Sequence, residues 1–480
     1  MRGSRSGLDS RLANTVATDA LAARLVWKGV SSRSVADPPR PNKERQMRLT
    51  LLLAASVFAV PQFAFAQAGA GASEASAEED RGRKGVEMVN HVLKPVPLEW
   101  SEERMGRLAL PDGFTIDVFA RDVENARMMD VAEDGTLYVT RRSNGDVLML
   151  RDTDGDGRAD QRRVVAQKED MHGIEIDGDT VYLMTVNDVY RTSRAEDGTL
   201  GEFELVADRF PEGGQHPNRM VQKGPDGKLY VSVGSTCNAC GETNEENATI
   251  TVMNTDGSDR RVFASGLRNT IGYGFEPTSG TLYGFDHGID WLGDNEQHEE
   301  FNRIEDGQRY GWPYVYAMSR FNPQDTPPDS SFSDYAANSR EPIGLHTPHA
   351  APMQMTFYTG DAFPEEYRGD AFIAMRGSWN RKTPSGYEVL RVDFENGQPV
   401  GMKPFITGFL MEDEESPTGW GHMGRLAGMA QATDGTLYLS DDTGGIIYRI
   451  SYEGDAAPDH PAPSFTNAEA GDLNLGLVEG

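Results

Sequence analysis

The sequence predicts an all-β fold, a six-bladed β-propeller of four-stranded antiparallel blades. The main observation is a recurring phrase in which a turn of the Asp-Gly type precedes alternating apolar residues. Glycine accepts positive φ in such a turn, and a period of two is typical of a strand with one buried face. So many hairpins suit radial repetition better than one sandwich. The copies lie at residues 133–139, 226–231 and 434–439, with weaker ones at 179–183, 279–283 and 369–373.

A cation or an imidazole stands upstream of every one of these hairpins, where the innermost strand of a blade would start. Each alone is an ordinary polar residue at a strand end, but the shared register predicts a positive ring at one channel mouth. In a chain of net charge −29, such a ring favours a multiply anionic ligand. The same charge excludes nucleic acid as a partner, because no basic stripe can neutralise phosphates. The ring residues are Arg127, His172, His216 with Arg219, Arg268 with Asn269, His349 and Arg425.

The ends of the chain differ in composition from the repeats. Residues 1–46 fit no targeting pattern, so we expect them to be an extension that precedes a true start at Met47. Residues 47–66 combine a basic start, a short apolar run and an Ala-Phe-Ala cleavage site, which predicts a Sec-type signal peptide rather than a membrane span. We therefore expect a periplasmic or secreted protein. The remaining segments are a linker over 67–95, the propeller over 96–455 and a disordered tail over 456–480.

The only two cysteines, Cys237 and Cys240, are three positions apart. In an exported protein this spacing predicts a short structural disulfide. Covalent haem would need histidine after the second cysteine, where Gly241 stands. A redox role for the pair stays open.

An acidic turn carries alternating carboxylates around a glycine, as calcium loops do. An EF-hand loop needs an acidic residue at its twelfth position, where this chain has Arg163. It also needs flanking helices, whereas the neighbouring segments here are predicted to be strands. The turn is therefore compatible with a structural calcium site or with a solvated acidic turn. Its carboxylates are Asp152, Asp154, Asp156 and Asp160.

Longer motifs cover the chain from about Leu110 to about Tyr452. They are His-Pro-Asn-Arg at 216–219, Gly-Pro-Asp-Gly-Lys-Leu-Tyr-Val-Ser-Val-Gly-Ser at 224–235, Gly-Leu-Arg-Asn at 266–269, Gly-Ile-Asp-Trp-Leu-Gly-Asp at 288–294, Tyr-Gly-Trp-Pro-Tyr at 310–314, Gly-Ser-Trp-Asn-Arg at 377–381 and Ser-Asp-Asp-Thr-Gly-Gly-Ile-Ile-Tyr-Arg at 440–449. Together they resemble the L-sorbosone dehydrogenase branch of the soluble pyrroloquinoline-quinone (PQQ) dehydrogenases. The resemblance implies a six-bladed propeller with PQQ over the channel mouth, in agreement with the repeats.

The resemblance implies the chemistry as well. Such an enzyme oxidises an aldose, or a sugar-derived aldehyde or alcohol, by hydride transfer to PQQ. His216 would be the general base that takes the hydroxyl proton. Arg268 would stabilise the negative charge that develops on the quinone. Because the sequence contains no haem motif, a separate acceptor, a cytochrome or a quinone, would take the electrons.

The cofactors are implied in the same way. Asn269, Arg425 and Arg376 match or replace PQQ contacts of relatives, and His172 joins them as a member of the ring. A Ca²⁺ ion that polarises PQQ would bind the backbone carbonyls of Gly288 and Ile289. Glucose-oxidising relatives have a second arginine where this chain has Ala427. The substrate is therefore left open.

Two other functions fit a propeller. Calcium-dependent lactonases hold their metal in the channel with Glu, Asn and Asp side chains, whereas Arg and His stand at the expected strand starts here. A non-catalytic propeller that binds an anionic glycan would have a similar ring. The fold alone does not choose between them, so the site must.

Overall fold

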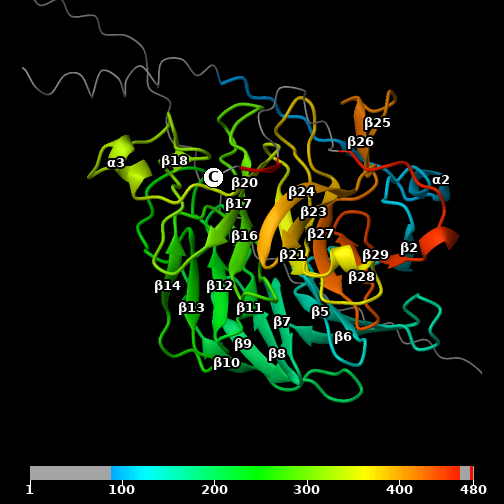
Figure 1. The fold of residues 1–480 in the computed structure, drawn as a ribbon. Helices are drawn as coiled ribbons and strands as arrows, with labels where there is room; N and C mark the ends of the chain where they lie inside the picture. The colour runs from blue at the N-terminus through cyan, green and yellow to red at the C-terminus, as the bar shows by residue number, and fades with distance from the viewer. Residues whose placement is uncertain (1–87, 465–475, 479–480) are drawn as a thin grey trace, which may run out of the picture. The chain divides into compact units, whose positions relative to one another are not determined.

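Antiparallel β-sheets follow one another along the chain in the computed structural model, which describes residues 88–464 and 476–478 (Figure 1). Within those residues, six sheets contain four or five strands each. The first three consist of strands paired in chain order. They are β3 (Met129–Val131), β4 (Leu137–Arg141), β5 (Asp146–Arg151) and β6 (Gln161–Gln167); β7 (Gly173–Asp177), β8 (Thr180–Met184), β9 (Val189–Ser193) and β10 (Glu204–Ala207); and β11 (Val221–Lys223), β12 (Leu229–Val233), β13 (Thr249–Met253) and β14 (Arg261–Ser265).

The other three sheets include strands from distant parts of the chain. The last of them takes its outer strand, β2, from the N-terminal side, and the fourth takes β30 from the C-terminal end. Their members are β15 (Gly272–Phe275), β16 (Leu282–Asp286), β17 (Glu299–Ile304), β20 (Gly344–His346) and β30 (Gly476–Leu477); β21 (Pro352–Phe357), β22 (Ala371–Met375), β23 (Glu388–Glu395) and β24 (Gln398–Ile406); and β27 (Leu426–Gln431), β28 (Leu437–Asp441), β29 (Ile446–Tyr452) and β2 (Phe114–Ala120).

Short elements complete the described part of the chain. A parallel pair joins β1 (Val96–Pro97) to β26 (Trp420–His422), which also pairs with β25 (Leu410–Glu412). A separate hairpin consists of β18 (Val315–Tyr316) and β19 (Arg320–Phe321). The helices are α2 (Glu102–Met105) and α3 (Phe332–Ala337), with single 3₁₀ turns at Glu365–Tyr367 and Gly454–Ala456. Among the described residues, no helix has the length and apolar character that crossing a membrane requires.

Each predicted hairpin joins the first two strands of a sheet. Gly135, Gly227 and Gly435 have φ of 82°, 77° and 83° in the three strong copies. These are left-handed conformations that glycine adopts without a steric penalty. The weaker copies lie in the corresponding connections β7–β8, β15–β16 and β21–β22. The prediction of an all-β fold with four-stranded antiparallel sheets is therefore confirmed.

The first strands of the sheets lie next to one another. Strand β3 contacts β7 and β27, β7 contacts β11, and β21 contacts β15 and β27. Gln354 on β21 connects three of these strands, because its Oε1 accepts from Met129 N at 2.9 Å and from Met429 N at 3.2 Å. Its Nε2 donates to the Met129 carbonyl at 2.7 Å. The segments that precede the first strands are thereby brought close together.

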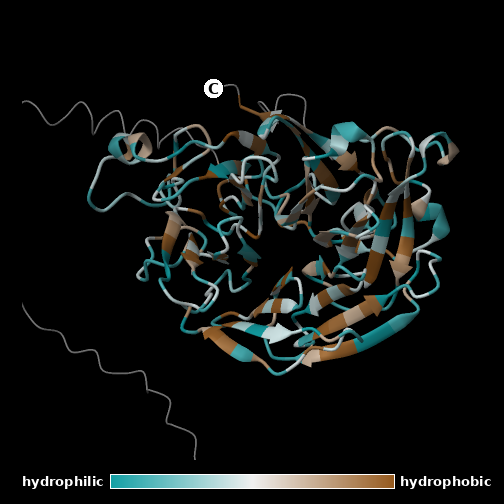
Figure 2. Ribbon diagram, turned by 60° about the horizontal axis from the view of Figure 1, so that its bottom comes forward, coloured by the Kyte–Doolittle hydropathy of each residue, from teal (hydrophilic) through white to brown (hydrophobic). Residues whose placement is uncertain are grey.

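Apolar side chains pack between the sheets, and Figure 2 shows the hydrophobic residues mostly on the strands. Strand β2 pairs with β29 in register from Phe114 opposite Tyr452. Phe114 is fully buried, and the rings of Phe363, Phe405 and Tyr452 lie with centroids 4.8 to 5.0 Å from its own. Burial of this aromatic cluster stabilises the attachment of the N-terminal strand to the last sheet.

Described residues of the predicted linker and of the predicted tail make contacts with the rest of the described chain. Part of the predicted linker is held in place, because the Val89 carbonyl accepts from Asp294 N at 2.9 Å and Leu93 N donates to the Trp379 carbonyl at 3.1 Å. Within the predicted tail, β30 pairs with β20. Local composition did not indicate either contact, because both are made with distant segments. The predicted upstream extension, the signal peptide, residues 67–87 of the linker and residues 465–475 and 479–480 of the tail lie outside the described residues.

Truncating Phe114 tests the attachment of β2. We expect Phe114→Ala to lower the free energy of unfolding by about 3–5 kcal/mol, because it leaves a cavity in a fully buried aromatic cluster. Urea denaturation followed by tryptophan fluorescence measures this change. Val400→Ala on β24 is the control, since Val400 is 51% exposed. Equal midpoints for the two variants would contradict the role of this cluster.

Candidate functional site

A cavity of about 320 Å³ lies where the segments preceding the first strands converge. This size is in the range of small-molecule sites. A second cavity of about 520 Å³ shares Arg376, Trp379 and Arg425 with the first, so the two adjoin. Most residues predicted from the sequence line the first cavity. They are Arg127, His216, Arg268, Asn269, Gly288, His349, Arg376 and Arg425.

His216 is held in one protonation state. Its Nδ1 lies 2.8 Å from Ser235 Oγ, and that hydroxyl donates its proton to the Cys237 carbonyl at 2.7 Å. The hydroxyl has one proton, so the ring must donate from Nδ1. Nε2 then carries a free lone pair. Burial, with the nearby Arg268 guanidinium, lowers the pKa of His216 to about 2, which keeps the imidazole neutral.

Arg268 is fixed on the same side of the cavity. Its side chain is 3% exposed. Nε donates to the Asn238 carbonyl at 2.9 Å, and one terminal nitrogen donates to Asn238 Oδ1 and to Asp290 Oδ2, each at 2.8 Å. These acceptors leave the guanidinium one orientation at the cavity wall.

The turn that carries Arg268 and Asn269 is bound to the neighbouring strand. The carboxylate of Asp286, at the end of β16, accepts from both backbone N–H groups at 2.8 Å. Burial raises the pKa of Asp286 to about 6. Among the described residues, the buried Oδ1 of Asn269 has no hydrogen-bond partner. Because a buried polar atom without a partner is costly, this atom is available to a ligand.

Arg127, Arg376 and Arg425 form a second group of cations in the cavity lining. Arg127 and Arg376 share one acceptor, Asp442 Oδ2, at 2.5 Å and 2.7 Å. Burial opposes the charge of Asp442, but the two guanidiniums lower its pKa. Arg425 donates to the Gly377 carbonyl at 3.2 Å, and burial together with Arg376 lowers its pKa. Guanidinium groups therefore outnumber the carboxylates paired with them among the described lining residues, and the cavity attracts anions.

His172 does not line the cavity, although the sequence placed it among the cofactor contacts. It is 1% exposed, with Nδ1 2.8 Å from the Arg219 carbonyl and Nε2 3.3 Å from an Arg127 nitrogen. His172 therefore contacts the lining residue Arg127 without lining the cavity itself. His349 is a lining residue, and its Nε2 donates to the Gly293 carbonyl at 2.9 Å.

Gly288 and Ile289, the predicted calcium ligands, lie in a loop whose backbone N–H groups are both occupied. Gly288 N donates to Glu299 Oε2 at 2.9 Å, and Ile289 N donates to Gln297 Oε1 at 3.1 Å. A side chain at Gly288 would place Cβ 2.5 Å from the Gln297 carbonyl oxygen, so only glycine fits. No described residue donates a hydrogen bond to the carbonyl oxygen of either. Carbonyl oxygens of this kind suit a hard cation.

Glu299 is the buried acid beneath this loop. Its second oxygen accepts from Ala351 N at 2.9 Å. Burial raises the pKa of Glu299 to about 8, so the group is mainly neutral at pH 7. It therefore holds the loop by hydrogen bonds and adds little negative charge.

The acidic turn lies outside the lining of this cavity. Asp152 accepts from Gly155 N at 2.7 Å and from Gly157 N at 2.8 Å. One carboxylate oxygen each from Asp152, Asp154 and Asp156 lies within 4.8 Å of the others, and Asp160 accepts from the Thr153 hydroxyl. The predicted calcium site in this turn stays a prediction, separate from the cavity.

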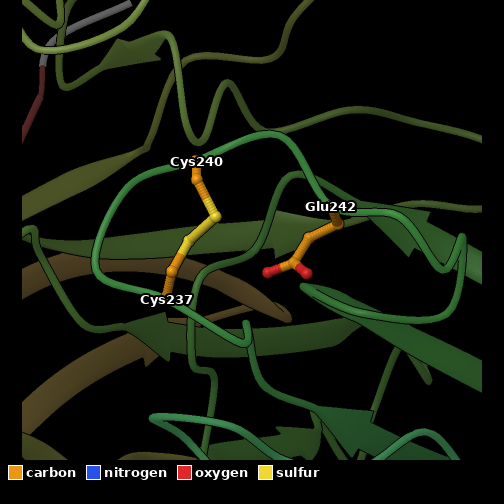
Figure 3. A group of neighbouring side chains, drawn as sticks. All are labelled: Cys237, Cys240 and Glu242. Carbon is orange, nitrogen blue, oxygen red and sulfur yellow. A yellow bond between two sulfur atoms is a disulfide. The ribbon is translucent and has the colours of Figure 1, made fainter.

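Cys237 and Cys240 form the predicted disulfide, with Cα atoms 6.2 Å apart (Figure 3). Glu242 lies beside them, and its carboxylate accepts from Thr236 N and Thr236 Oγ1, each at 2.7 Å. Thiolates, not disulfide sulfurs, are the cysteine ligands of metals. In the oxidised state this group is therefore a covalent cross-link beside the cavity.

Several site residues were not singled out from the sequence. Asp290, Trp379, Asn380 and Asp442 all fall inside motifs at 288–294, 377–381 and 440–449, so motif membership was an available signal. Glu299 is outside those motifs. Its role depends on a contact with a loop eleven residues away, which local patterning does not indicate.

The sequence profile of the TrAA12-like family matches residues 108–453. The chain belongs to the TrAA12-like family. An uncharacterized protein of Borreliella burgdorferi is 27% identical over 379 residues, which are 74% of this chain and 93% of that protein. A pyrroloquinoline quinone-dependent pyranose dehydrogenase of Coprinopsis cinerea is 25% identical over 232 residues, 40% of this chain but 31% of that enzyme. The chain thus covers under a third of that larger protein.

Solved structures show that the fold of this TrAA12-like protein is shared with β-propeller dehydrogenases. The holo PQQ domain of the Coprinopsis cinerea pyranose dehydrogenase has a TM-score of 0.62 at 21% identity, covering 74% of this chain and 98% of that one. A calcium structure of the Trichoderma reesei AA12 protein has a TM-score of 0.61 at 21% identity, covering 72% and 97%. The apo aldose sugar dehydrogenase of Escherichia coli has a TM-score of 0.53 at 15% identity, covering 71% and 99%.

The neutral state of His216 has a consequence for stability in this TrAA12-like protein. The unfolded imidazole gains a proton below about pH 6.5, whereas the native imidazole, with a pKa of about 2, does not. The contribution of His216 to stability therefore falls as the pH falls below about 6.5. The free energy of unfolding of wild type minus that of His216→Gln should drop by about 1.2 kcal/mol between pH 6 and pH 5. Urea titrations at each pH measure it, and a pH-independent difference would show that native His216 binds the proton.

Proposed function

We propose that this protein is a PQQ-dependent dehydrogenase that oxidises an aldose or a sugar-derived aldehyde or alcohol. One observation carries the proposal: a half-buried, neutral imidazole with a free Nε2 faces the same cavity as an excess of guanidinium groups. An anionic cofactor suits these cations, and a proton acceptor suits oxidation of a hydroxyl. The names of the pyranose dehydrogenase and aldose sugar dehydrogenase relatives support it.

The six sheets are, in this proposal, the six blades of one closed propeller. The contacts between first strands and the pairing of β2 with β29 support this, since the last blade then combines both ends of the repeats. Such a ring leaves short, protected sheet edges. The cavity would occupy one mouth of the central channel.

The donor set of the cavity fits PQQ, which carries carboxylates and quinone oxygens. Arg425 and Arg376 would bind carboxylates, for which the guanidinium fork is well shaped. The unpartnered Oδ1 of Asn269 would meet a polar atom of the cofactor. Arg127, supported by His172, adds positive charge next to them. When bound, PQQ supplies a quinone that accepts a hydride.

His216 and Arg268 have distinct roles in the reaction. His216 Nε2 accepts the proton of the substrate hydroxyl, while Nδ1–H stays bonded to Ser235. Arg268, held by Asn238 and Asp290, is a preorganised positive charge that would stabilise negative charge developing on a bound quinone. Because both groups are oriented before the substrate arrives, little reorganisation is needed during the reaction.

Calcium would bind the carbonyl oxygens of Gly288 and Ile289 and polarise the cofactor. The two backbone N–H groups are already occupied by Glu299 and Gln297, which holds the loop in place for a cation. We assign the protein to the L-sorbosone branch on its motifs, with export by the predicted signal peptide and with a separate electron acceptor.

A lactonase would need carboxylate and amide oxygens free to hold a catalytic metal. The amide oxygens of Asn218 and Asn269 have no partner among the described residues, but the carboxylates are already engaged. Glu299 accepts two backbone N–H groups, and Asp290 pairs with Arg268. A non-catalytic glycan-binding propeller would bind PQQ or a glycan without turnover. The assay below separates these functions from a dehydrogenase.

Replacing the base tests the enzyme class. Purified protein with PQQ and Ca²⁺ should reduce a dye in the presence of sugars or aldehydes, and neither addition alone should suffice. We expect His216→Ala to bind PQQ as wild type does while kcat falls by about 10²–10⁴, because general-base catalysis is lost. A dye-linked assay and a fluorescence titration with PQQ measure the two quantities. His460→Ala, outside the cavity, is the matched control. Absence of PQQ binding in wild type would overturn the proposed function.

Metal removal distinguishes the two predicted calcium sites. We expect EDTA to abolish dye reduction and Ca²⁺ to restore it. The triple variant Asp152→Asn, Asp154→Asn, Asp156→Asn should keep the same calcium requirement, because its turn lies outside the cavity. Activity of the EDTA-treated protein measured against added Ca²⁺ gives the result. A triple variant that no longer responds to calcium would assign the functional ion to the acidic turn.

A further inference from the structure

The four-residue loop closed by the Cys237–Cys240 disulfide hydrogen-bonds Arg268 directly and is connected to His216 through Ser235. The loop lies outside any strand and is half-buried, and it begins four residues after β12 ends. The cysteine pair is the only one in the chain. A ring this small restricts the backbone of the residues inside it far more than a free loop would.

Asn238, inside this ring, is an acceptor for several distant groups at once. Its side-chain oxygen accepts from Arg268 and from Asp290 N, each at 2.8 Å. Its carbonyl accepts from Arg268 Nε at 2.9 Å and from Trp312 Nε1 at 3.2 Å. Two oxygens of Asn238 therefore accept hydrogen bonds from Arg268, and one of them also accepts from the backbone N–H of Asp290. Because Asp290 follows Ile289 directly, its hydrogen bond to Asn238 also restrains the loop that contains Gly288 and Ile289.

The second connection runs from the disulfide-closed loop to His216. The carbonyl of Cys237 accepts the Ser235 hydroxyl proton at 2.7 Å. Because the Ser235 hydroxyl proton is donated to the Cys237 carbonyl, Ser235 Oγ can only accept a hydrogen bond from His216 Nδ1, at 2.8 Å. The Ser235 carbonyl, 3.2 Å from Nδ1, can only accept and favours the same tautomer. If the Cys237 carbonyl moved away, the hydroxyl could donate to Nδ1 in competition with that carbonyl, and part of the population would then carry the imidazole proton on Nε2.

We propose that Asn238 and the disulfide that closes its loop are positioning elements, which together hold Arg268 in its orientation and His216 with its proton on Nδ1. The inference rests on the roles proposed for these two residues. Neither Asn238 nor the cystine touches the reacting atoms in this scheme. Through this one covalently closed loop, the orientation of Arg268 and the position of the proton on His216 depend on the same residues.

Reduction of the disulfide tests the connection to His216 in the protein without cofactor. Dithiothreitol delivers two electrons and two protons to the bond, which gives two thiols while the reagent closes to its own cyclic disulfide. The thiols are then alkylated with iodoacetamide and the reagents removed. With ¹⁵N-labelled histidine, two-dimensional NMR distinguishes a protonated ring nitrogen from an unprotonated one. We expect the His216 signals to change from Nδ1–H alone to a mixture of both tautomers.

Controls separate this effect from damage by the reagent. The double variant Cys237→Ser, Cys240→Ser should show the mixture before treatment and should not respond to dithiothreitol. Because the chain has no other cysteine, wild type treated with iodoacetamide alone should keep the single tautomer. The histidines outside the cavity, such as His460, should keep their signals throughout.

Substitution of Asn238 tests the connection to Arg268. We expect Asn238→Ala to lower kcat and PQQ affinity each by about 10- to 100-fold, the range produced when hydrogen bonds to a charged group are lost. KM for the sugar should change little. Asn238→Asp keeps oxygen acceptors at the same place and should recover most of both quantities, which also covers the case in which Asn238→Ala does not fold. Asn144→Ala, at an exposed turn, is the matched control.

The results separate this inference from the proposed function. A wild-type protein without PQQ-dependent turnover would overturn the dehydrogenase proposal, yet its histidine signals before and after reduction would still decide whether the loop positions His216. An unchanged His216 tautomer after reduction would overturn the inference. So would wild-type kcat and PQQ affinity in Asn238→Ala.

Discussion

The pairing of β2 with β29 is the constraint on which the rest of the structure depends. It joins a strand from the N-terminal side of the repeats to the last sheet, and Phe114 buries its ring among residues of the fifth and sixth sheets. A sheet that lacked this outer strand would expose an unpaired edge. The residues that line the cavity precede first strands of different sheets, so their mutual distances depend on every sheet keeping its place.

Within that frame, the cavity concentrates charge that is unfavourable without a partner. Burial lowers the pKa of Arg127 to about 10 and also lowers that of Arg425. Asp442 compensates two of the guanidiniums but cannot neutralise the whole group. Cations buried in excess are costly for the fold, and an anion bound between them removes part of that cost. The excess positive charge that is unfavourable for the fold by itself is the property that would select an anionic cofactor.

Buried neutral acids and bases hold the geometry of the site. His216 stays unprotonated and Glu299 stays mainly protonated because burial disfavours the charged form of each. The first has a lone pair free for a proton, and the second binds a loop without adding a competing negative charge. Hydrogen-bond partners, rather than ion pairs, orient both groups. The disulfide loop adds a covalent restraint next to them.

The sequence by itself determined the strand repeats, the turn glycines and the position of a cation or imidazole before each first strand. These features are local, since period-two alternation and a glycine turn are encoded within about ten residues. Much of the cavity lining was therefore predictable, including His216, Arg268 and Arg425. Tertiary structure alone decided that His172 lies behind Arg127, that Glu299 and Asn238 hold the site, and that residues 89–93 and β30 pack against distant segments. Each of these depends on contacts between residues far apart in the chain, and such contacts leave no periodic signal in the sequence.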